Sequence, residues 1–421
     1  MKQVKQYEMM LKEIGKKFVK FLKWTGASTL IGINVGLVGT AFSYGMNYAT
    51  STREAHPELI FGLPIAGLVI VLLYHIARRD NDKGTNSVLL AVRSEERLPI
   101  VMAPLIFIST ILTHLFGGSA GREGAALQLG GSIGNWFSKI FRRNADDEKV
   151  MIMCGMSACF SALFGTPMAA AIFALEVVNV GTMYYSALVP CVFSALIATG
   201  IASALGVHSE AMTIMEIPDF TLLSGVQIVI LAILCAVVSV AFCVLLHVVA
   251  SKGKKLLPNP YIRIVVMAVA VIVITMLLQT ADYMGAGMGI IEKCIVHGEV
   301  KPEAFLVKMF LTAITLGAGY KGGEIVPSFF IGATFGCLLG GIMGISPSLC
   351  AAVGMIAVFC GVTNSPITSL LIALELFGME AFPYFLLGVA VSYMLSGYHS
   401  LYHTQKIVYS KYKAETLEKE A

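Results

Sequence analysis

The chain has 421 residues, a formal net charge of +4, and 57% hydrophobic but only 13% charged residues. Soluble domains carry about 25% charged residues, and a soluble fold of this composition would expose unusually large apolar patches. Cytosolic enzymes, nucleic-acid-binding proteins and disordered proteins are therefore excluded. The apolar runs are continuous and suit helices that cross a membrane, whereas the strands of an outer-membrane barrel alternate apolar and polar residues. We expect an all-α polytopic membrane protein.

The first 24 residues contain seven lysines and two glutamates. Apolar residues recur there at helical spacing, at Val4, Tyr7, Leu11, Ile14, Phe18 and Phe21. This pattern predicts a basic amphipathic helix on the cytoplasmic membrane surface. The tail at 403–421 is also rich in lysine, so the positive-inside rule places both termini in the cytoplasm and implies an even number of crossings.

Apolar segments follow one another along the rest of the chain. They lie near 26–50, 60–77, 99–116, 149–177, 185–205, 221–250, 261–279, 304–318, 326–345, 350–377 and 382–397. Glycine or proline interrupts several of them. Interrupted helices are tolerated at membrane depth only where they line a cavity or are buried in protein.

The sequence also repeats itself. Residues 155–176 match residues 354–375 without a gap, and residues 121–130 parallel residues 323–332. Internal repeats with interrupted helices are typical of transporters that bind their substrate near the membrane midplane. We predict four parts, which are the N-terminal helix 1–24, a first transmembrane repeat 25–210, a second repeat 211–402 and a short cytoplasmic tail 403–421.

Three glycine-containing segments, at 83–86, 117–124 and 322–327, are predicted to begin helices. A helix N-terminus has free N–H groups and a partial positive charge, and glycine lets the backbone approach an anion closely. Three such starts that converge would form a pocket for a small anion without a strongly basic side chain.

Glu123 lies beside Arg122 within apolar sequence. A carboxylate within the membrane is costly and suggests a function. Ionised Glu123 could occupy the anion site, and protonated Glu123 could leave it, which would couple anion flux to proton flux. The alternative is that Arg122 and Glu123 form a simple ion pair at a membrane interface.

Three further acids need an explanation. Glu324 is proposed to assist proton transfer or selectivity, and the alternative is a salt bridge with Lys321. Glu176 and Glu375 end the same Ala-Leu-Glu run in the two repeats. Their equivalence predicts a structural role, such as hydrogen bonding to backbone at a helix end.

These motifs resemble those of the CLC chloride channels and proton-coupled anion exchangers. GREGAALQLGGSIG (121–134) resembles their GREGPxVQ motif, and GGEIVP (322–327) occupies the place of GxFxP. Residues 155–176 resemble the Pro-containing helix that follows, and GYHSLYHTQ (397–405) resembles the stretch with the pore tyrosine. The resemblance implies a fold of two inverted repeats with broken helices and a homodimer with one pore in each subunit.

Residue by residue, the resemblance makes Glu123 the gating and proton-carrying glutamate and puts Thr85 in the place of the pore serine. The expected anion-binding residues are Thr85, Asn86, Gly121, Arg122, Gly124, Ile325, Val326 and Tyr402. No metal ion or cofactor is expected.

Three departures point to the bacterial fluoride/proton antiporter branch of the family. Thr85 replaces the serine, Glu324 occupies the variable position of the second motif, and Val177 stands where chloride exchangers keep an inner glutamate. We therefore predict a fluoride/proton antiporter of a bacterial plasma membrane. A chloride/proton exchanger or a passive chloride channel of the same fold is the alternative, and an intramembrane enzyme is disfavoured.

Overall fold

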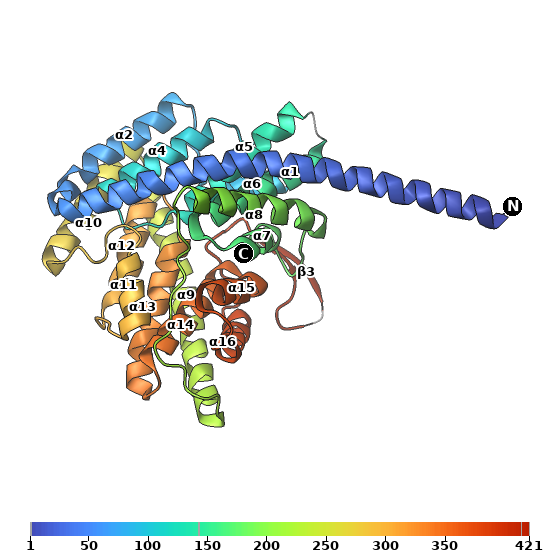
Figure 1. Cartoon of the computed structure of the whole chain (residues 1–421). Helices are drawn as coiled ribbons and strands as arrows, with labels where there is room; N and C mark the ends of the chain where they lie inside the picture. Colours follow the sequence, from blue (N-terminus) through green and yellow to red (C-terminus); the bar gives the residue numbers. More distant parts are fainter. Residues whose placement is uncertain (1, 142–143, 414, 421) are drawn as a thin grey trace.

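The computed structural model describes residues 2–141, 144–413 and 415–420, which are almost entirely helical (Figure 1). The first half contains α1 (Lys2–Ala55), α2 (Leu63–Ile76), α3 (Thr85–Val92), α4 (Met102–Leu115), α5 (Glu123–Ile140), α6 (Ala145–Phe164), α7 (Pro167–Glu176) and α8 (Leu188–Ala204). The second half contains α9 (Leu222–Leu256), α10 (Pro260–Leu278), α11 (Met288–Glu292), α12 (Ala304–Ala318), α13 (Ile325–Met343), α14 (Pro347–Thr363), α15 (Pro366–Phe377) and α16 (Phe382–Leu395).

A small sheet joins the C-terminal tail to the first half. Its strands are β1 (Asn179–Val180), β2 (Lys406–Tyr409) and β3 (Thr416–Glu420), in the order β1-β2-β3. Strand β2 pairs with β1 in parallel and with β3 in antiparallel orientation. The tail is therefore fixed to the segment that follows α7.

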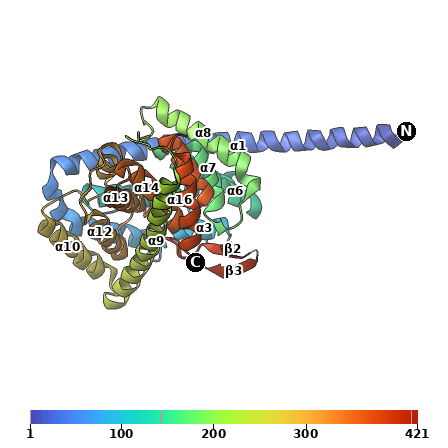
Figure 2. The ribbon, with the colours of Figure 1, turned by 90° about the horizontal axis from the view of Figure 1, so that it is seen from below.

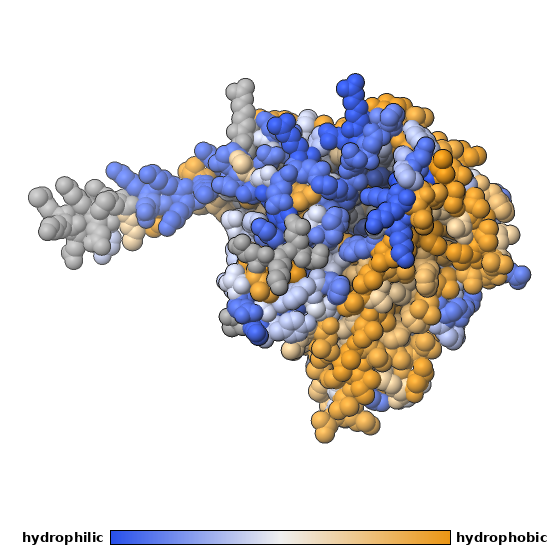
Figure 3. All heavy atoms as spheres, turned by 180° about the vertical axis from the view of Figure 1, so that it is seen from behind, coloured by the Kyte–Doolittle hydropathy of each residue, from blue (hydrophilic) through white to orange (hydrophobic). Residues whose placement is uncertain are grey.

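Six helical stretches of the described chain are long and apolar enough to cross a membrane. They are Met10–Ala55, Pro57–Ile76, Tyr185–Ala204, Leu222–Leu256, Pro260–Leu278 and Ile325–Met343. Apolar side chains cover a broad area of the outer surface (Figure 3), and Leu222 and Leu277 are 88% and 78% exposed. Outward-facing side chains of this kind suit contact with lipid, which agrees with the predicted polytopic helical protein.

The N-terminal lysine-rich segment and the first crossing form one helix, α1, of 54 residues. Its N-terminal part extends away from the body of the protein (Figures 1 and 2). The predicted boundary near residue 24 falls within this helix without a break. The placement of the segment on a membrane surface stays a prediction.

Glycines that the sequence repeat aligns occupy equivalent helix contacts. A Cβ atom on Gly130 of α5 would lie 2.0 Å from the carbonyl oxygen of Gly155 in α6. A Cβ atom on Gly332 of α13 would lie 2.3 Å from the carbonyl oxygen of Gly354 in α14. Side chains at these positions would separate the backbones, so glycine allows the same close crossing in both halves.

Glu176 of α7 binds the start of α15, and Glu375 of α15 binds the start of α7. The Glu176 carboxylate, at the end of α7, accepts hydrogen bonds from the backbone N–H groups of Ile367 (3.1 Å) and Thr368 (2.8 Å) in α15. The Glu375 carboxylate in α15 accepts hydrogen bonds from the N–H groups at 168 and 169 of α7, both at 2.9 Å. The predicted structural role of the two glutamates is confirmed.

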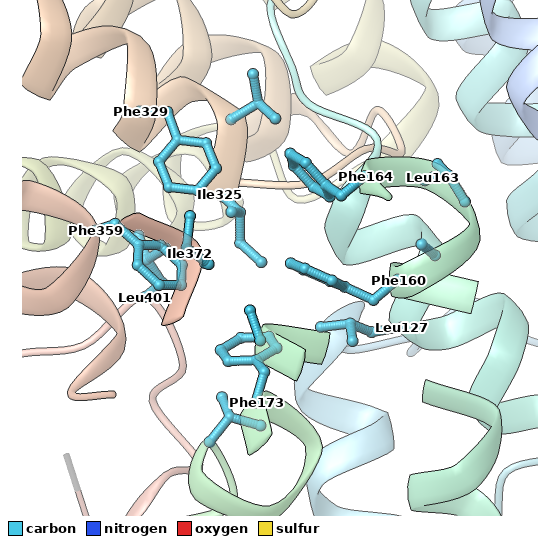
Figure 4. Packing of buried hydrophobic residues seen from close by; sticks show 14 of the residues in the cluster. Leu127, Phe160, Leu163, Phe164, Phe173, Ile325, Phe329, Phe359, Ile372 and Leu401 are labelled. Carbon is cyan, nitrogen blue, oxygen red and sulfur yellow. The ribbon is translucent and has the colours of Figure 1, made fainter. Parts of the chain in front are cut away.

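A closed ring of phenylalanines packs where the two halves meet (Figure 4). Its members, in order around the ring, are Phe160, Phe164, Phe329, Phe359 and Phe173, with neighbouring ring centroids 4.9 to 6.1 Å apart. Three come from the first half and two from the second. This aromatic contact packs α6 and α7 of the first half against α13 and α14 of the second half.

Candidate functional site

The three predicted helix starts are confirmed. Helix α3 begins at Thr85 after Gly84, whose φ of +63° lies in the region that favours glycine. Helix α5 begins at Glu123, and α13 begins at Ile325. Each therefore exposes its first-turn N–H groups at the segment that the sequence singled out.

Two of these starts are joined by their glycines. Gly121 and Gly323 form an antiparallel bridge in which each N–H donates to the other's carbonyl oxygen at 2.7 Å. A Cβ atom on Gly323 would lie 2.4 Å from the backbone nitrogen of Gly124. The contact brings the start of α5, with Glu123, against the start of α13, with Glu324.

Glu123 is fully buried. Its Oε2 accepts a hydrogen bond from the Arg122 backbone N–H at 3.0 Å, and its Oε1 lies 3.4 Å from Arg122 Nε. The ion pair considered as the alternative does form, with exposed fractions of 11% for the Arg122 side chain and 0% for Glu123. Burying a charge pair costs desolvation energy, so this contact is a weak explanation of Glu123 as a stabilising residue.

Glu324 does not form the salt bridge with Lys321 that was considered as the alternative explanation. Lys321 Nζ instead contacts Asp82 Oδ2 at 2.7 Å and lies 4.1 Å from the centroid of the Tyr74 ring. Within the described chain, Glu324 Oε2 is buried without a hydrogen-bond partner. A Cβ atom on Gly124 would lie 3.3 Å from this oxygen, which places the carboxylate at the start of α5.

Thr85 and Asn86 begin α3 on another side of the same region. Thr85 Oγ1 lies 3.5 Å from the Gly124 carbonyl oxygen, and a Cβ atom on Gly124 would lie 2.8 Å from it. Asn86 Oδ1 accepts hydrogen bonds from the N–H (3.2 Å) and the hydroxyl (2.9 Å) of Thr404. Asn86 thus anchors the C-terminal segment, a contact that the sequence did not predict.

Tyr402 lies in that anchored segment. It is fully buried, and within the described residues its hydroxyl has no hydrogen-bond partner. It interacts electrostatically with Glu123 and Glu324. Gln405 fixes the segment by donating from Nε2 to the Val177 carbonyl oxygen at 2.8 Å.

Ile325 and Val326 form the first turn of α13 and are 0% and 1% exposed. Their apolar side chains leave the backbone N–H groups as the polar atoms that this turn contributes. The structure therefore brings residues from the three motifs together around Gly124, whereas the anion-binding roles of Thr85, Asn86, Gly121, Arg122, Gly124, Ile325, Val326 and Tyr402 stay predictions.

Two features of the site were missed in the sequence. Arg122 Nη2 contacts Glu210 Oε1, although Glu210 belongs to the loop 205–221 between α8 and α9 and no motif marks it. The phenylalanine ring did have a signal, because Phe160 and Phe359 stand at the same offset of the sequence repeat.

Comparison with known proteins finds relatives that are described as anion channels or transporters. The family described as "Voltage gated chloride channel" matches residues 65–397. A "Chloride/fluoride channel protein" of Pseudomonas syringae pv. tomato is 34% identical over 397 residues, which cover 93% of this chain and 88% of that protein. An "H(+)/Cl(-) exchange transporter ClcA" of Vibrio cholerae is 25% identical, covering 83% of this chain and 81% of the transporter.

Solved structures show the same architecture. A CLC-type fluoride/proton antiporter superposes with a TM-score of 0.89 at 32% identity, covering 93% of this chain and 99% of that one. A slow cyanobacterial Cl⁻/H⁺ antiporter superposes with a TM-score of 0.77 at 20% identity, covering 89% and 94% of the two chains, which concerns the fold alone. The predicted CLC-type fold is confirmed.

Proposed function

Since this chain belongs to the CLC family of anion channels and transporters, multi-pass membrane proteins that are not enzymes, we propose that it exports fluoride in exchange for protons. The observation that carries the proposal is the placement of two acids, Glu123 and Glu324, at facing helix starts joined by the Gly121–Gly323 bridge. The likeness to a fluoride/proton antiporter at 32% identity supports the choice of ion.

Glu123 acts in this proposal as the gate. Its ionised carboxylate is held by Arg122 at the start of α5, where the helix dipole also favours a negative charge. Protonation removes both attractions, so the neutral side chain leaves and an anion takes its place. When the side chain returns and releases its proton, anion and proton have moved in opposite directions.

Glu324 assists the proton in the same proposal. It stands at the N-cap position of α13 without a side-chain capping hydrogen bond, and its buried Oε2 is free of hydrogen bonds within the described chain. Two ionised carboxylates close together repel each other, so a proton that reaches the site is bound by one of them. Tyr402, which is fully buried, interacts electrostatically with both acids.

Fluoride selectivity follows from the donors around Gly124. Fluoride is smaller than chloride and requires shorter hydrogen bonds than chloride does. The strength and spacing of the donors can therefore make the site selective for fluoride. The Thr85 hydroxyl, the Asn86 amide and the first-turn N–H groups of Ile325 and Val326 are the proposed donors. Asn86 Nδ2 makes a 3.5 Å contact with the Lys83 carbonyl oxygen. This long contact is the one that Asn86 Nδ2 would lose when it donates to an anion.

Chloride transport by the same site is the second candidate. The ClcA transporter of Vibrio cholerae, 25% identical to this chain, is its support. Val177 argues against proton-coupled chloride exchange, because a buried hydrocarbon side chain carries no proton. A passive chloride channel does not need an acid at that position.

We also propose a homodimer with one pore per subunit, embedded in the plasma membrane with both termini in the cytoplasm. The family resemblance supports the dimer. The lysines of the N-terminal helix and of the tail support the orientation.

The proposal is tested in liposomes loaded with potassium fluoride or potassium chloride. External anion and pH are recorded together after a potassium ionophore is added. The antiporter predicts fluoride efflux with matched proton uptake into the liposomes and little chloride efflux. Chloride efflux as fast as fluoride efflux would overturn it, and the pH trace would then separate a chloride exchanger from a channel.

A further inference from the structure

Arg122 contacts two carboxylates that come from different elements. Its Nε lies 3.4 Å from Glu123 Oε1 at the start of α5, and its Nη2 contacts Oε1 of Glu210. The burial of the three side chains increases from Glu210 to Glu123, with exposed fractions of 21% for Glu210, 11% for Arg122 and 0% for Glu123. Glu210 is thus the most exposed of the three side chains.

The loop that carries Glu210 contacts the ends of α6 and α15. The Glu210 N–H donates to the carbonyl oxygen of Phe164, the last residue of α6, at 3.5 Å, and the Met212 N–H donates to Leu376 of α15 at 2.9 Å. Ser209 packs against Gly165, where an added Cβ would lie 2.8 Å from the Ser209 Cα. These contacts accompany the placement of the Glu210 carboxylate beside Arg122.

The charge arrangement gives Glu210 a role beyond packing. One guanidinium can neutralise one carboxylate fully, and here it lies between two. With Glu210 present, the charge of Arg122 is already balanced when Glu123 takes up a proton and moves away. Without Glu210, the departure of Glu123 would leave a largely buried cation unpaired, which is costly.

We propose that Glu210 is a positioning residue for Glu123, which acts through Arg122 and sets the proton concentration at which Glu123 is released. This inference rests on the proposed role of Glu123 as the proton-carrying gate.

Other titratable groups of the neighbouring elements have different contacts. Glu324 and Tyr402 belong to the second repeat, the Glu375 carboxylate of α15 binds the start of α7, and His208 is exposed on the same loop as Glu210. Glu210 is the acid that shares the guanidinium with Glu123.

The sign of the effect follows from the charges. Removal of the Glu210 charge leaves Arg122 free to attract ionised Glu123 more strongly. A higher proton concentration is then needed to neutralise Glu123 and release it. The Glu210→Gln variant should keep fluoride/proton coupling, because Glu123 is intact, but its transport should require a lower pH.

The experiment measures fluoride efflux and proton uptake in liposomes at a series of pH values. For Glu210→Gln we expect the pH of half-maximal transport to fall by about one unit, a tenfold change in proton concentration, with the ratio of fluoride to protons unchanged. Glu210→Asp keeps the charge but shortens its reach, so its profile should shift less and in the same direction. The matched control is Glu216→Gln, which removes the same charge from an exposed position of the same loop and should leave the profile unchanged.

An unchanged or alkaline-shifted profile for Glu210→Gln overturns the inference, and so does an equal shift for Glu216→Gln. If Glu210→Gln does not fold, Glu210→Asp decides alone, and an unchanged profile again overturns the inference. A wild-type protein whose fluoride efflux moves no protons would instead show that the proposed antiport is wrong.

Discussion

Gly121 and Gly323 exchange two backbone hydrogen bonds of 2.7 Å, so the glycine-rich loops of the two repeats form one antiparallel bridge. The bridge fixes the distance between the starts of α5 and α13, and hence between Glu123 and Glu324. A side chain at this point would force the two helix starts apart.

Gly323→Ala should therefore damage transport more than folding. Its Cβ would lie 2.4 Å from the Gly124 backbone nitrogen, and overpacking of this kind costs about 1–3 kcal/mol. We expect a lower thermal unfolding temperature and loss of most fluoride efflux. The control is Gly341→Ala, whose Cβ would meet nothing within 4 Å, and an equal loss in this control would contradict the explanation.

Glu123→Gln should abolish proton coupling, because an amide neither carries the proton nor mimics the anion. Positioned proton-transfer groups contribute about 100-fold or more, so fluoride-driven proton uptake should fall by at least that factor. Simultaneous recording of fluoride and pH checks this, with Glu380→Gln at an exposed position as the control. Proton uptake that survives in the Glu123 variant would remove Glu123 from the mechanism.

Thr85→Ser should weaken the preference for fluoride over chloride. Thr85 is 2% exposed and packs beside Gly124. Removal of its methyl group lets the hydroxyl adopt more positions, so the hydroxyl is less well placed to donate to a small anion. We expect the ratio of fluoride to chloride efflux to fall about tenfold, or about 1.4 kcal/mol. Thr275→Ser in α10 is the control, and an unchanged ratio for Thr85→Ser would move selectivity to Asn86 or the backbone.

Glu176→Ala should destabilise the protein, because the carboxylate accepts two backbone hydrogen bonds and one from the Thr368 hydroxyl at 2.6 Å. Hydrogen bonds to charged groups contribute about 1.5–3 kcal/mol, so a loss of about 2 kcal/mol is expected from thermal unfolding. Glu375→Ala should behave alike. Glu380→Ala, at an exposed position after α15, should have little effect.

The stability contributed by Lys411 in the tail should depend on pH. Burial lowers the pKa of Lys411 to about 8, whereas an unfolded lysine has a pKa near 10.4. Between these values the unfolded chain binds more protons, so stability rises with pH. From pH 7 to 9, the wild type should gain about 1 kcal/mol relative to Lys411→Met. Unfolding temperatures of the two proteins at both pH values check this, and a constant difference would contradict it.

The helix starts of the site were predictable because their signals are local. At 84–85, 122–124 and 322–325, glycine stands beside an acidic or hydroxyl residue. This local pattern predicts a helix start whatever the packing of that helix in the folded protein. The equivalence of Glu176 and Glu375 was predictable because the repeat aligns them.

The partners of these residues were not predictable in the same way. Lys321 lies three residues from Glu324 but pairs with Asp82, and Asn86 bonds to Thr404, 318 residues further along. Such choices depend on how the two halves pack, and no spacing rule within one segment contains that information. Glu210 escaped notice because its partner Arg122 lies 88 residues away in the same repeat, and no local spacing links the two.

The exchange of caps between α7 and α15 also bears on the ancestry of the chain. In each half, the first N–H groups of one helix donate to a glutamate of the other half, to Glu176 in one direction and to Glu375 in the other. Two copies of a single half-length chain, arranged around a two-fold axis, would make the same pair of contacts. Gene duplication and fusion of a self-associating ancestor would produce this arrangement. The contact between two ancestral chains would then have become the contact between α7 and α15 within one chain.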